Sequence, residues 1–189
     1  MTTKVLAFAG SARNESFNKR LVKIAAKGAE NAGAEVTFLD LKDYDLPIFN
    51  EDLEKEGTPE AVKALKKQLI EHDGFLIASP EYNSSVTALL KNAIDWASRP
   101  AEGEPMLAAF QGKVAGLMAT SPGGLGGLRG LVHLRAILGN IGVIVLPNQM
   151  AIPKAFEAFD DQGQLKDENQ QNAILGIGSS VAETAAKLK

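Results

Sequence analysis

The chain has 189 residues, 45% of them hydrophobic, and a formal net charge of −3 at pH 7. This is the profile of one globular domain of ordinary size. Without cysteine it has no disulfide or thiol chemistry, and its two histidines do not suggest a metal site. Neither a Lys/Arg run suited to nucleic acid nor the roughly 20 consecutive apolar residues of a membrane span occurs. With no signal-peptide pattern, we expect a single cytoplasmic domain over residues 1–189, with no nucleic-acid, membrane or metal partner.

Short apolar runs alternate along the chain with segments whose apolar residues recur at helical spacing. The expected strands cover residues 4–9, 34–41, 74–80, 113–121 and 142–147. A helix is expected after each strand, the first beginning near Asn18 and the second entered through Thr58 and Pro59. Between the second strand and its helix, residues 42–60 are expected to form a long surface loop. Five strands alternating with five helices predict an α/β domain with a parallel sheet covered on both faces.

Two details of the expected helices bear on the later argument. The third helix, which carries the apolar stripe of residues 86–97, is expected to be capped by Ser84 or Ser85. The last helix contains Gly176 and Gly178, which are expected to weaken it.

Three loops rich in small and polar residues follow the first, third and fourth expected strands, at residues 10–18, 80–85 and 121–127. In an open α/β sheet, ligands bind beyond the carboxyl ends of the strands, where the strand order reverses. We therefore expect these three loops to meet at one edge of the sheet and to form the ligand site.

The first loop, GSARNESFN, gathers donors that suit a phosphate group. A helix that begins near Asn18 points unpaired backbone N–H groups and the positive end of its dipole into the loop. The Ser11 and Ser16 hydroxyls add donors, and the Arg13 guanidinium adds a charge that matches phosphate oxygens. We interpret the loop as a phosphate site. The alternative is that Ser16 or Asn18 only caps the helix.

The second and third loops have the character of a site for a flat ligand. Tyr82 offers an aromatic face, and Asn83 can both donate to and accept from a pyrimidine-like ring edge. The alternatives are a packed tyrosine and, for Glu81, either a catalytic acid or a solvated charge. The glycine-rich third loop allows close backbone approach, or is a plain flexible turn. Because no carboxylate pair, catalytic triad or metal cluster can be assembled here, we expect no catalytic side chain. If electrons move in this protein, a cofactor must carry them, since the chain has no cysteine.

Two stretches, GSARNESFNKRL (10–21) and SPEYNSSVTALLKNAIDWASRP (79–100), resemble the NADPH-dependent FMN reductase family of soluble quinone, azo-dye, chromate and ferric reductases. The resemblance extends from residue 4 to about residue 152. It implies a flavodoxin-like three-layer fold with strand order 2-1-3-4-5, non-covalently bound FMN, and NADPH or NADH as electron donor. It also implies a homodimer or homotetramer, for which the apolar side of LLKNAIDW (89–96) is a candidate contact.

The resemblance also assigns cofactor-binding residues. Those that match the family's phosphate loop are Ser11, Arg13, Ser16, Phe17 and Asn18. Those that match the loop beside the ribityl chain and ring are Pro80, Glu81, Tyr82, Asn83 and Ser84. Ser121, Gly123 and Gly124 stand where a third flavin loop is expected. Arg99 is a candidate contact for a nicotinamide-nucleotide phosphate or for an acidic group across a subunit interface; the alternative is an ordinary surface arginine.

The reaction implied by the resemblance has two steps. Hydride passes from a nicotinamide nucleotide to FMN, and then to a small acceptor such as a quinone, an azo compound, chromate or a ferric complex. Two alternatives stay open. A flavodoxin-type electron carrier would usually have a strongly acidic surface and no Arg in its phosphate loop, and a regulatory protein would keep the FMN site without turnover.

Overall fold

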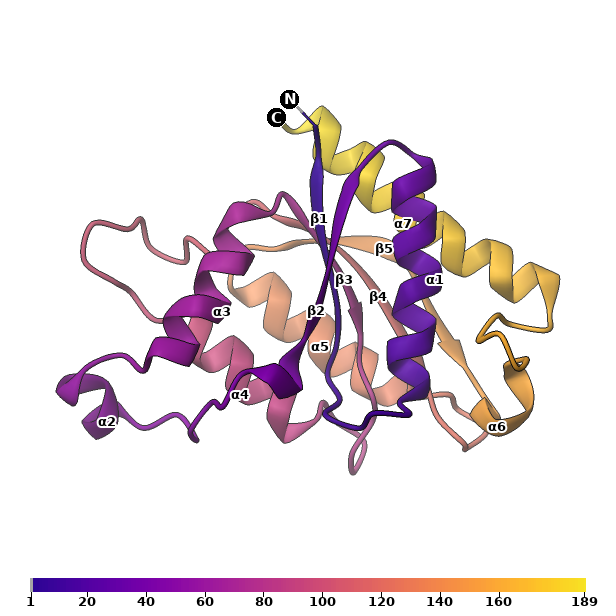
Figure 1. Ribbon diagram of the computed structural model, residues 1–189, viewed down its shortest axis with the longest axis horizontal. Helices are drawn as coiled ribbons and strands as arrows, with labels where there is room; N and C mark the ends of the chain where they lie inside the picture. The colour runs from indigo at the N-terminus through magenta and orange to yellow at the C-terminus, as the bar shows by residue number, and fades with distance from the viewer. Residues whose placement is uncertain (1) are drawn as a thin grey trace.

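Five parallel strands form the sheet at the centre of the molecule (Figure 1). The computed structural model describes residues 2–189 and orders the strands β2-β1-β3-β4-β5. They are β1 (Lys4–Ala9), β2 (Glu35–Asp40), β3 (Gly74–Ala78), β4 (Val114–Thr120) and β5 (Ile144–Ile152). Strands β3 and β4 are buried along their whole length, as central parallel strands are. The expected flavodoxin-like strand order is confirmed.

Helices cover both faces of the sheet and make the molecule three-layered. One face carries α1 (Phe17–Asn31) and α7 (Glu168–Lys187), and the other carries α3 (Glu60–Glu71), α4 (Ala88–Ala97) and α5 (Leu128–Asn140). The short helices α2 (Glu51–Glu56) and α6 (Ala155–Ala158) and the 3-10 turn η1 (Leu41–Asp43) lie in connections. The carboxyl ends of the strands point to the lower edge in Figure 1, where the loops of interest lie.

Helices α1 and α7 approach each other so closely that two glycines are required at their contact. A Cβ on Gly178 would lie 1.8 Å from the carbonyl oxygen of Ala25, and one on Gly28 would lie 2.0 Å from that of Leu175. Gly176 is exposed and has no neighbouring atom within 4 Å of such a Cβ. The expectation that both glycines weaken this helix therefore misses the role of Gly178, which allows the two helices to pack.

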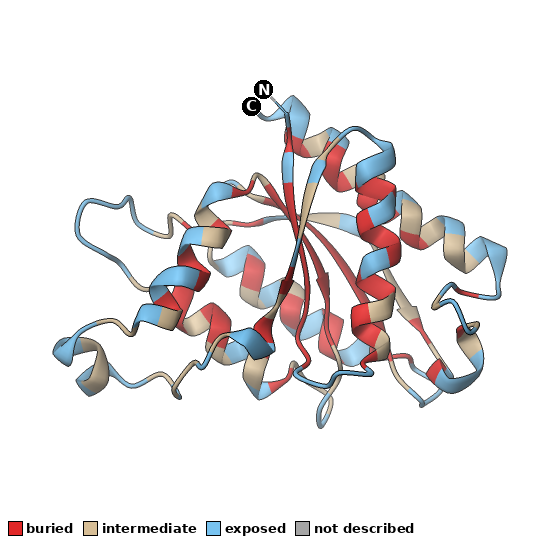
Figure 2. Cartoon of the chain, viewed as in Figure 1, coloured by how far each residue is buried: buried red, intermediate tan, exposed pale blue. Residues whose placement is uncertain are grey.

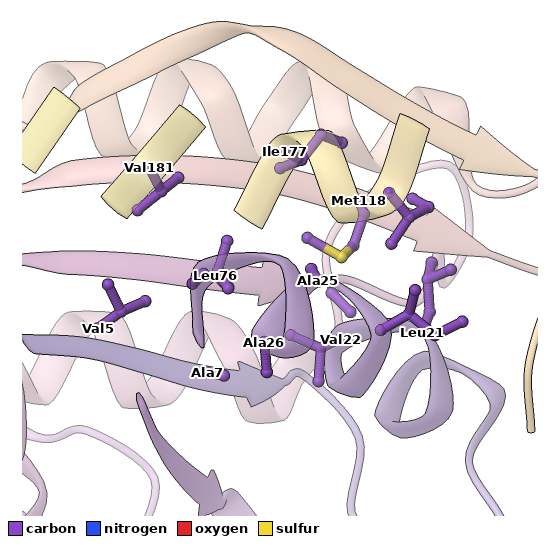
Figure 3. Close-up of a cluster of buried hydrophobic side chains, with 14 of the residues drawn as sticks. Val5, Ala7, Leu21, Val22, Ala25, Ala26, Leu76, Met118, Ile177 and Val181 are labelled. Carbon is purple, nitrogen blue, oxygen red and sulfur yellow. The ribbon is translucent and has the colours of Figure 1, made fainter. Parts of the chain in front are cut away.

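Apolar side chains fill the space between this helix pair and the sheet. Val22 of α1 and Ile177 and Val181 of α7 are buried with Leu76 and Met118 of the sheet (Figure 3). The opposite face has its own core, in which the apolar stripes of α3, α4 and α5 meet the sheet. In Figure 2 the buried residues of all five long helices face the sheet, and the outer faces are exposed. Of the buried apolar residues in 89–96, Leu90, Ala93 and Ile94 belong to this second core. Trp96 instead packs against Phe49.

The connection after β2, expected to be a long surface loop, also contains regular structure. It contains η1 and α2, and α2 has no buried residue. Helix α2 forms through local polar interactions, because the Asn50 side chain caps it at the N–H of Asp52 and its first turn is acidic. Apolar periodicity cannot reveal such a helix.

Three expected boundaries also shift. Helix α4 is capped by Thr87, which accepts from the N–H of Leu90, and by neither Ser84 nor Ser85. Helix α3 follows Pro59 without a side-chain cap, so Thr58 does not have the expected role. Strand β5 continues beyond residue 147 through a register shift, and Arg135 donates to the carbonyls of Val145 and Leu146 there.

Candidate cofactor site

Three loops meet at the carboxyl edge of the sheet, and buried side chains link them in pairs. Between the first and second loops, the Thr87 hydroxyl donates to the carbonyl of Gly10 at 2.7 Å. Gly10 leaves no room for a side chain, because its Cβ would lie 2.9 Å from that of Leu90. Helix α4 therefore begins directly against the end of β1.

The first loop presents unpaired donors at the start of α1. The backbone N–H groups of Asn14, Glu15, Phe17 and Asn18 have no hydrogen-bond partner within residues 2–189. The oxygens of Ser11 and Ser16 accept from the N–H groups of Arg13 and Lys19, at 3.3 and 3.4 Å, which leaves each hydroxyl proton available. Ser16 is indeed the cap of α1. Both side chains are buried, so the loop offers a set of donors at fixed positions that suits an anion.

Arg13 and Phe17 flank these donors in different ways. Arg13 is exposed, and its guanidinium donates to the carbonyl of Glu15 at 3.3 Å, so its charge stays within the loop. The Phe17 ring stacks on Phe159 and meets the edge of Phe156, with centroid distances of 5.7 and 5.2 Å. Phe17 thereby ties the start of α1 to the segment that follows β5.

Asn18 links the first loop to the third. Its side-chain amide donates to the Thr120 carbonyl at 2.9 Å and accepts from the Thr120 N–H at 3.0 Å. The side chain is buried, and both of its polar ends point to the end of β4. In this arrangement Asn18 contributes to the loop through its free backbone N–H, and its side chain holds two loops together.

The second loop contains a tight turn over residues 82–85. Tyr82 and Ser85 exchange two backbone hydrogen bonds of 3.0 Å, and the two residues between them have positive φ angles, 50° at Asn83 and 66° at Ser84. Such a turn favours Asn and Gly, so Ser84 is strained. Pro80 precedes the turn, and the Tyr82 side chain is exposed. The turn projects this aromatic face outward at the sheet edge.

Glu81 connects the second loop to the start of α5. One carboxylate oxygen accepts from Nε and Nη2 of Arg129, at 2.8 and 2.6 Å, and the other accepts from the N–H of Gly130 at 3.2 Å. Burial raises the pKa of Glu81, but the hydrogen bonds and charge of Arg129 and the Gly130 N–H outweigh it, so the net pKa is lowered. The carboxylate is therefore ionised at neutral pH and occupied within the chain.

The third loop is held by backbone hydrogen bonds at Ser121 and at the Gly123 carbonyl, and residues 122–125 are exposed. Ser121 donates its N–H to Ile152 and accepts from the N–H of Ala155. At Gly123 and Gly124, φ is not positive and no atom lies within 3.5 Å of an added Cβ, so nothing in residues 2–189 requires glycine. Gly126 is different, since its φ is 62° and a Cβ would collide with Ile152. Neither packing nor backbone conformation explains why these two exposed positions are glycine. The lack of a side chain there suits the close approach of a ligand.

Arg99 does not join the three loops. Its Nε donates to Glu54 at 2.8 Å and its guanidinium lies 5.3 Å from the Phe49 ring centroid. Helix α4 is about 15 Å long at 1.5 Å per residue; its N-terminus adjoins Gly10, whereas Arg99 follows its C-terminus. Arg99 lines a separate cleft of about 490 Å³ between α3 and the end of α4.

Several residues that shape this edge were not singled out from the sequence. Thr87, Thr120 and Arg129 make the links between loops, and His133 Nδ1 lies 2.9 Å from the Ser85 hydroxyl. Their partners are distant in the chain, so local patterns carry no signal for them. No helix in residues 2–189 is long and apolar enough to cross a membrane, and no cluster of three or more His, Asp or Glu in the same range is placed to hold a metal.

A parallel sheet of order β2-β1-β3-β4-β5, with a loop of free donors after its first strand and two further loops at the same edge, is the architecture of flavodoxin-like proteins. The model of the NADPH-dependent FMN reductase family matches residues 3–157. The chain belongs to this family, and it is an FMN-dependent oxidoreductase that uses NAD(P)H.

Relatives with named activities support the assignment of the chain to this family. The chain is 38% identical to NAD(P)H:quinone oxidoreductase of Solanum tuberosum, covering 98% of this chain and 94% of the relative. It is 38% identical to an NAD(P)H-dependent FMN reductase of Pseudomonas aeruginosa, over 90% and 89%. Among solved structures it is similar to the flavoenzyme NAD(P)H:(acceptor) oxidoreductase FerB of Paracoccus denitrificans, with 32% identity, a TM-score of 0.83 and 98% of each chain covered.

Proposed function

We propose that this protein reduces quinones and similar small acceptors, with FMN held at the three-loop edge. The observation that carries the placement is the group of free N–H donors at the start of α1, together with the hydroxyls of Ser11 and Ser16. Such a set fits a phosphate dianion, and the family is one of FMN enzymes. The quinone acceptor is supported by the named activities of the relatives from potato and Pseudomonas putida.

Each loop has a separate task in this proposal. The first loop binds the phosphate through backbone N–H groups, Ser11, Ser16 and the Arg13 charge. The turn from Pro80 to Ser84 borders the ring and ribityl chain, and the third loop, with Ser121, Gly123 and Gly124, brings backbone close to the ring. Phe17 and Asn18 hold the first loop in place.

When bound, FMN supplies the group that accepts hydride from NAD(P)H and passes it to the acceptor. The chain's own residues orient the two reactants and shield them from water, and no side-chain acid or base is assigned. Tyr82 is exposed at this edge, where its ring can border the flat molecule that enters. Arg99 has no part in the proposed site, since it is paired with Glu54 on another surface.

The proposal extends to a cytoplasmic homo-oligomer. Leu125, Leu128 and Val132 are 53%, 44% and 58% exposed in the third loop and along α5. Apolar side chains that adjoin a ligand edge suit a second copy of the chain that covers it. Sedimentation at micromolar concentration should show a species heavier than the 20.0 kDa monomer, and a monomer would contradict this part of the proposal.

The test of function is steady-state turnover. The purified protein should be yellow or should bind added FMN, and a catalytic amount should oxidise an excess of NADPH or NADH when a benzoquinone is present. An electron carrier or a regulator would oxidise at most one equivalent per site. Protein that binds no FMN would remove the proposed site, whereas FMN binding without turnover would retain the site and remove the activity.

A further inference from the structure

The first turn of α5 lacks a cap of its own. Its N-cap residue is Gly127, which has a φ of 93° and no side chain. The Glu81 carboxylate, from the neighbouring loop, accepts from the Gly130 N–H, and the Arg129 N–H faces it as well. A carboxylate placed there satisfies unpaired helix donors and favours the positive end of the helix dipole. Glu81 therefore caps α5 from a different segment of the chain.

This cap distinguishes the two helices that begin at the ligand edge. In α1, the N–H groups of Phe17 and Asn18 have no partner among residues 2–189. In α5, the N–H groups of Arg129 and Gly130 face Glu81, and that of Leu128 donates to the Leu125 carbonyl. The start of α1 is open to an external anion, and the start of α5 is closed by an internal one. The Glu81 carboxylate is thus unsuited to bind phosphate. Its contacts within the chain indicate a structural role.

What Glu81 holds is the turn over residues 82–85. Its carboxylate fixes the chain immediately before the turn, and its side chain is only 8% exposed. At the other end, the Ser85 hydroxyl is paired with His133 of α5. Gly130 completes the contact, because a Cβ there would lie 3.2 Å from the Ser85 carbonyl oxygen. Helix α5 therefore holds the turn at both ends.

The turn needs such support because it is strained. Asn83 and Ser84 both have positive φ angles, and a serine persists there only where the surroundings fix the conformation. If the support is lost, the turn relaxes and the exposed Tyr82 ring changes its position. The phosphate loop would not move, because its links through Thr87 and Asn18 are independent of Glu81.

We propose that Glu81 and Arg129 are positioning residues that hold the turn over residues 82–85 in the shape that receives the flavin ring. The proposal rests on the proposed placement of FMN. It assigns the Glu81 side chain no contact with the cofactor, and its influence is exerted through the turn.

Comparing the affinities for FMN and riboflavin separates the contribution of the flavin ring to binding from that of the phosphate. Both flavins have the same ring, and only FMN has the phosphate, so the ratio of their affinities reports on the first loop alone. The variants are Glu81→Ala, Arg129→Met and Arg129→Lys, with Glu183→Ala as the matched control, since Glu183 is exposed on α7 and has no ion pair in the described chain. Affinities come from fluorescence titration, and the ring environment from visible circular dichroism of the bound flavin.

Glu81→Ala should weaken the binding of FMN and of riboflavin by the same factor, about tenfold, as expected if the receptive shape of the turn falls to roughly a tenth of the population. The affinity ratio should stay within about twofold of the wild-type value, and the visible dichroism should change. Arg129→Met should have a smaller effect in the same direction, with partial recovery in Arg129→Lys. Glu183→Ala should match the wild type.

Unchanged affinities and dichroism in Glu81→Ala would overturn the proposal, and so would a loss confined to FMN. If that variant does not fold, Glu81→Gln keeps the side-chain volume and an acceptor for Gly130 while removing the charge, and the same criteria apply to it. Should the wild-type protein bind riboflavin as tightly as FMN, the proposed phosphate loop fails, and the positioning role is then judged on riboflavin affinity alone.

Discussion

The α1–α7 face and the ligand edge are held together by different kinds of contact. On the face, backbone touches backbone at Gly28 and Gly178, and apolar side chains fill what remains. At the edge, polar side chains such as Asn18, Thr87 and Glu81 link the loops at fixed positions.

This difference shows how a rigid domain keeps a site available. If the loops packed as tightly as the helices do, their backbone donors would be consumed within the chain. Because side chains make the links, the N–H groups at the start of α1 remain free for a ligand. A change on the face should therefore affect stability, and a change at the edge should affect binding as well.

The largest expected effect is on the face. Gly178→Val should lower the free energy of unfolding by about 3 kcal/mol or more, because overpacking at a contact of 1.8 Å forces α7 away from α1. The matched control is Gly176→Ala. It should raise the free energy of unfolding by about 0.5 kcal/mol, since the space around residue 176 is open and Ala favours a helix. Urea unfolding followed by circular dichroism measures both. Equal effects of the two variants would show that the close contact does not exist.

The link between the first and third loops comes next. Asn18→Ala should lower the free energy of unfolding by about 2 kcal/mol, because the N–H and carbonyl of Thr120 lose their buried partners. It should also weaken FMN binding, unlike a change on the face. Asn140→Ala, at the exposed end of α5, makes the same chemical change without a buried partner and should do neither. If Asn18→Ala binds FMN as tightly as the wild type does, the link between Asn18 and Thr120 does not contribute to the cofactor site.

Arg13 offers a test that affects binding alone. Arg13→Ala should weaken the binding of FMN by about 1.5 kcal/mol, roughly tenfold in affinity, because the phosphate loses its bond to an exposed guanidinium. Stability of the protein without FMN should not change, since the only hydrogen bond of the Arg13 side chain within residues 2–189 is to the Glu15 carbonyl of its own loop. Lys23→Ala removes a positive charge from the middle of α1 and serves as the control. A fluorescence titration that gives equal affinities for the two variants would remove Arg13 from the site.

The smallest expected effect is the pH dependence of the Glu81 link. The pKa of Glu81 is lowered below its ordinary 4.5 in the folded protein, so the carboxylate stabilises the fold above its unfolded pKa. This contribution is lost as the pH falls through the lowered folded pKa. At pH 7, Glu81→Gln should be less stable than the wild type by about 1 kcal/mol, a modest value because Arg129 is exposed. The difference should shrink toward pH 3, and a constant difference would contradict the assignment.

Local sequence patterns determined the positions of the five strands and of the long helices. Continuous apolar runs such as 74–78 can only be buried between two layers, and apolar spacing marked the inner face of each long helix. The same patterns located the three loops, because each follows a strand and interrupts its apolar run with Gly, Ser and Asn. Helix α2 was missed, since its caps and charges are local and no buried residue marks it.

Only the tertiary structure decided how the loop side chains are used. Asn18 and Glu81 were both assigned to the cofactor, and their side chains are bonded to Thr120 and to the start of α5, partners 102 and 48 or 49 positions away in the chain. The need for glycine at 178 likewise arises from Ala25 of another helix. A sequence determines which groups a loop can offer, through residue type and spacing. Which of them remain free for a ligand depends on long-range contacts that exist only once the sheet has assembled.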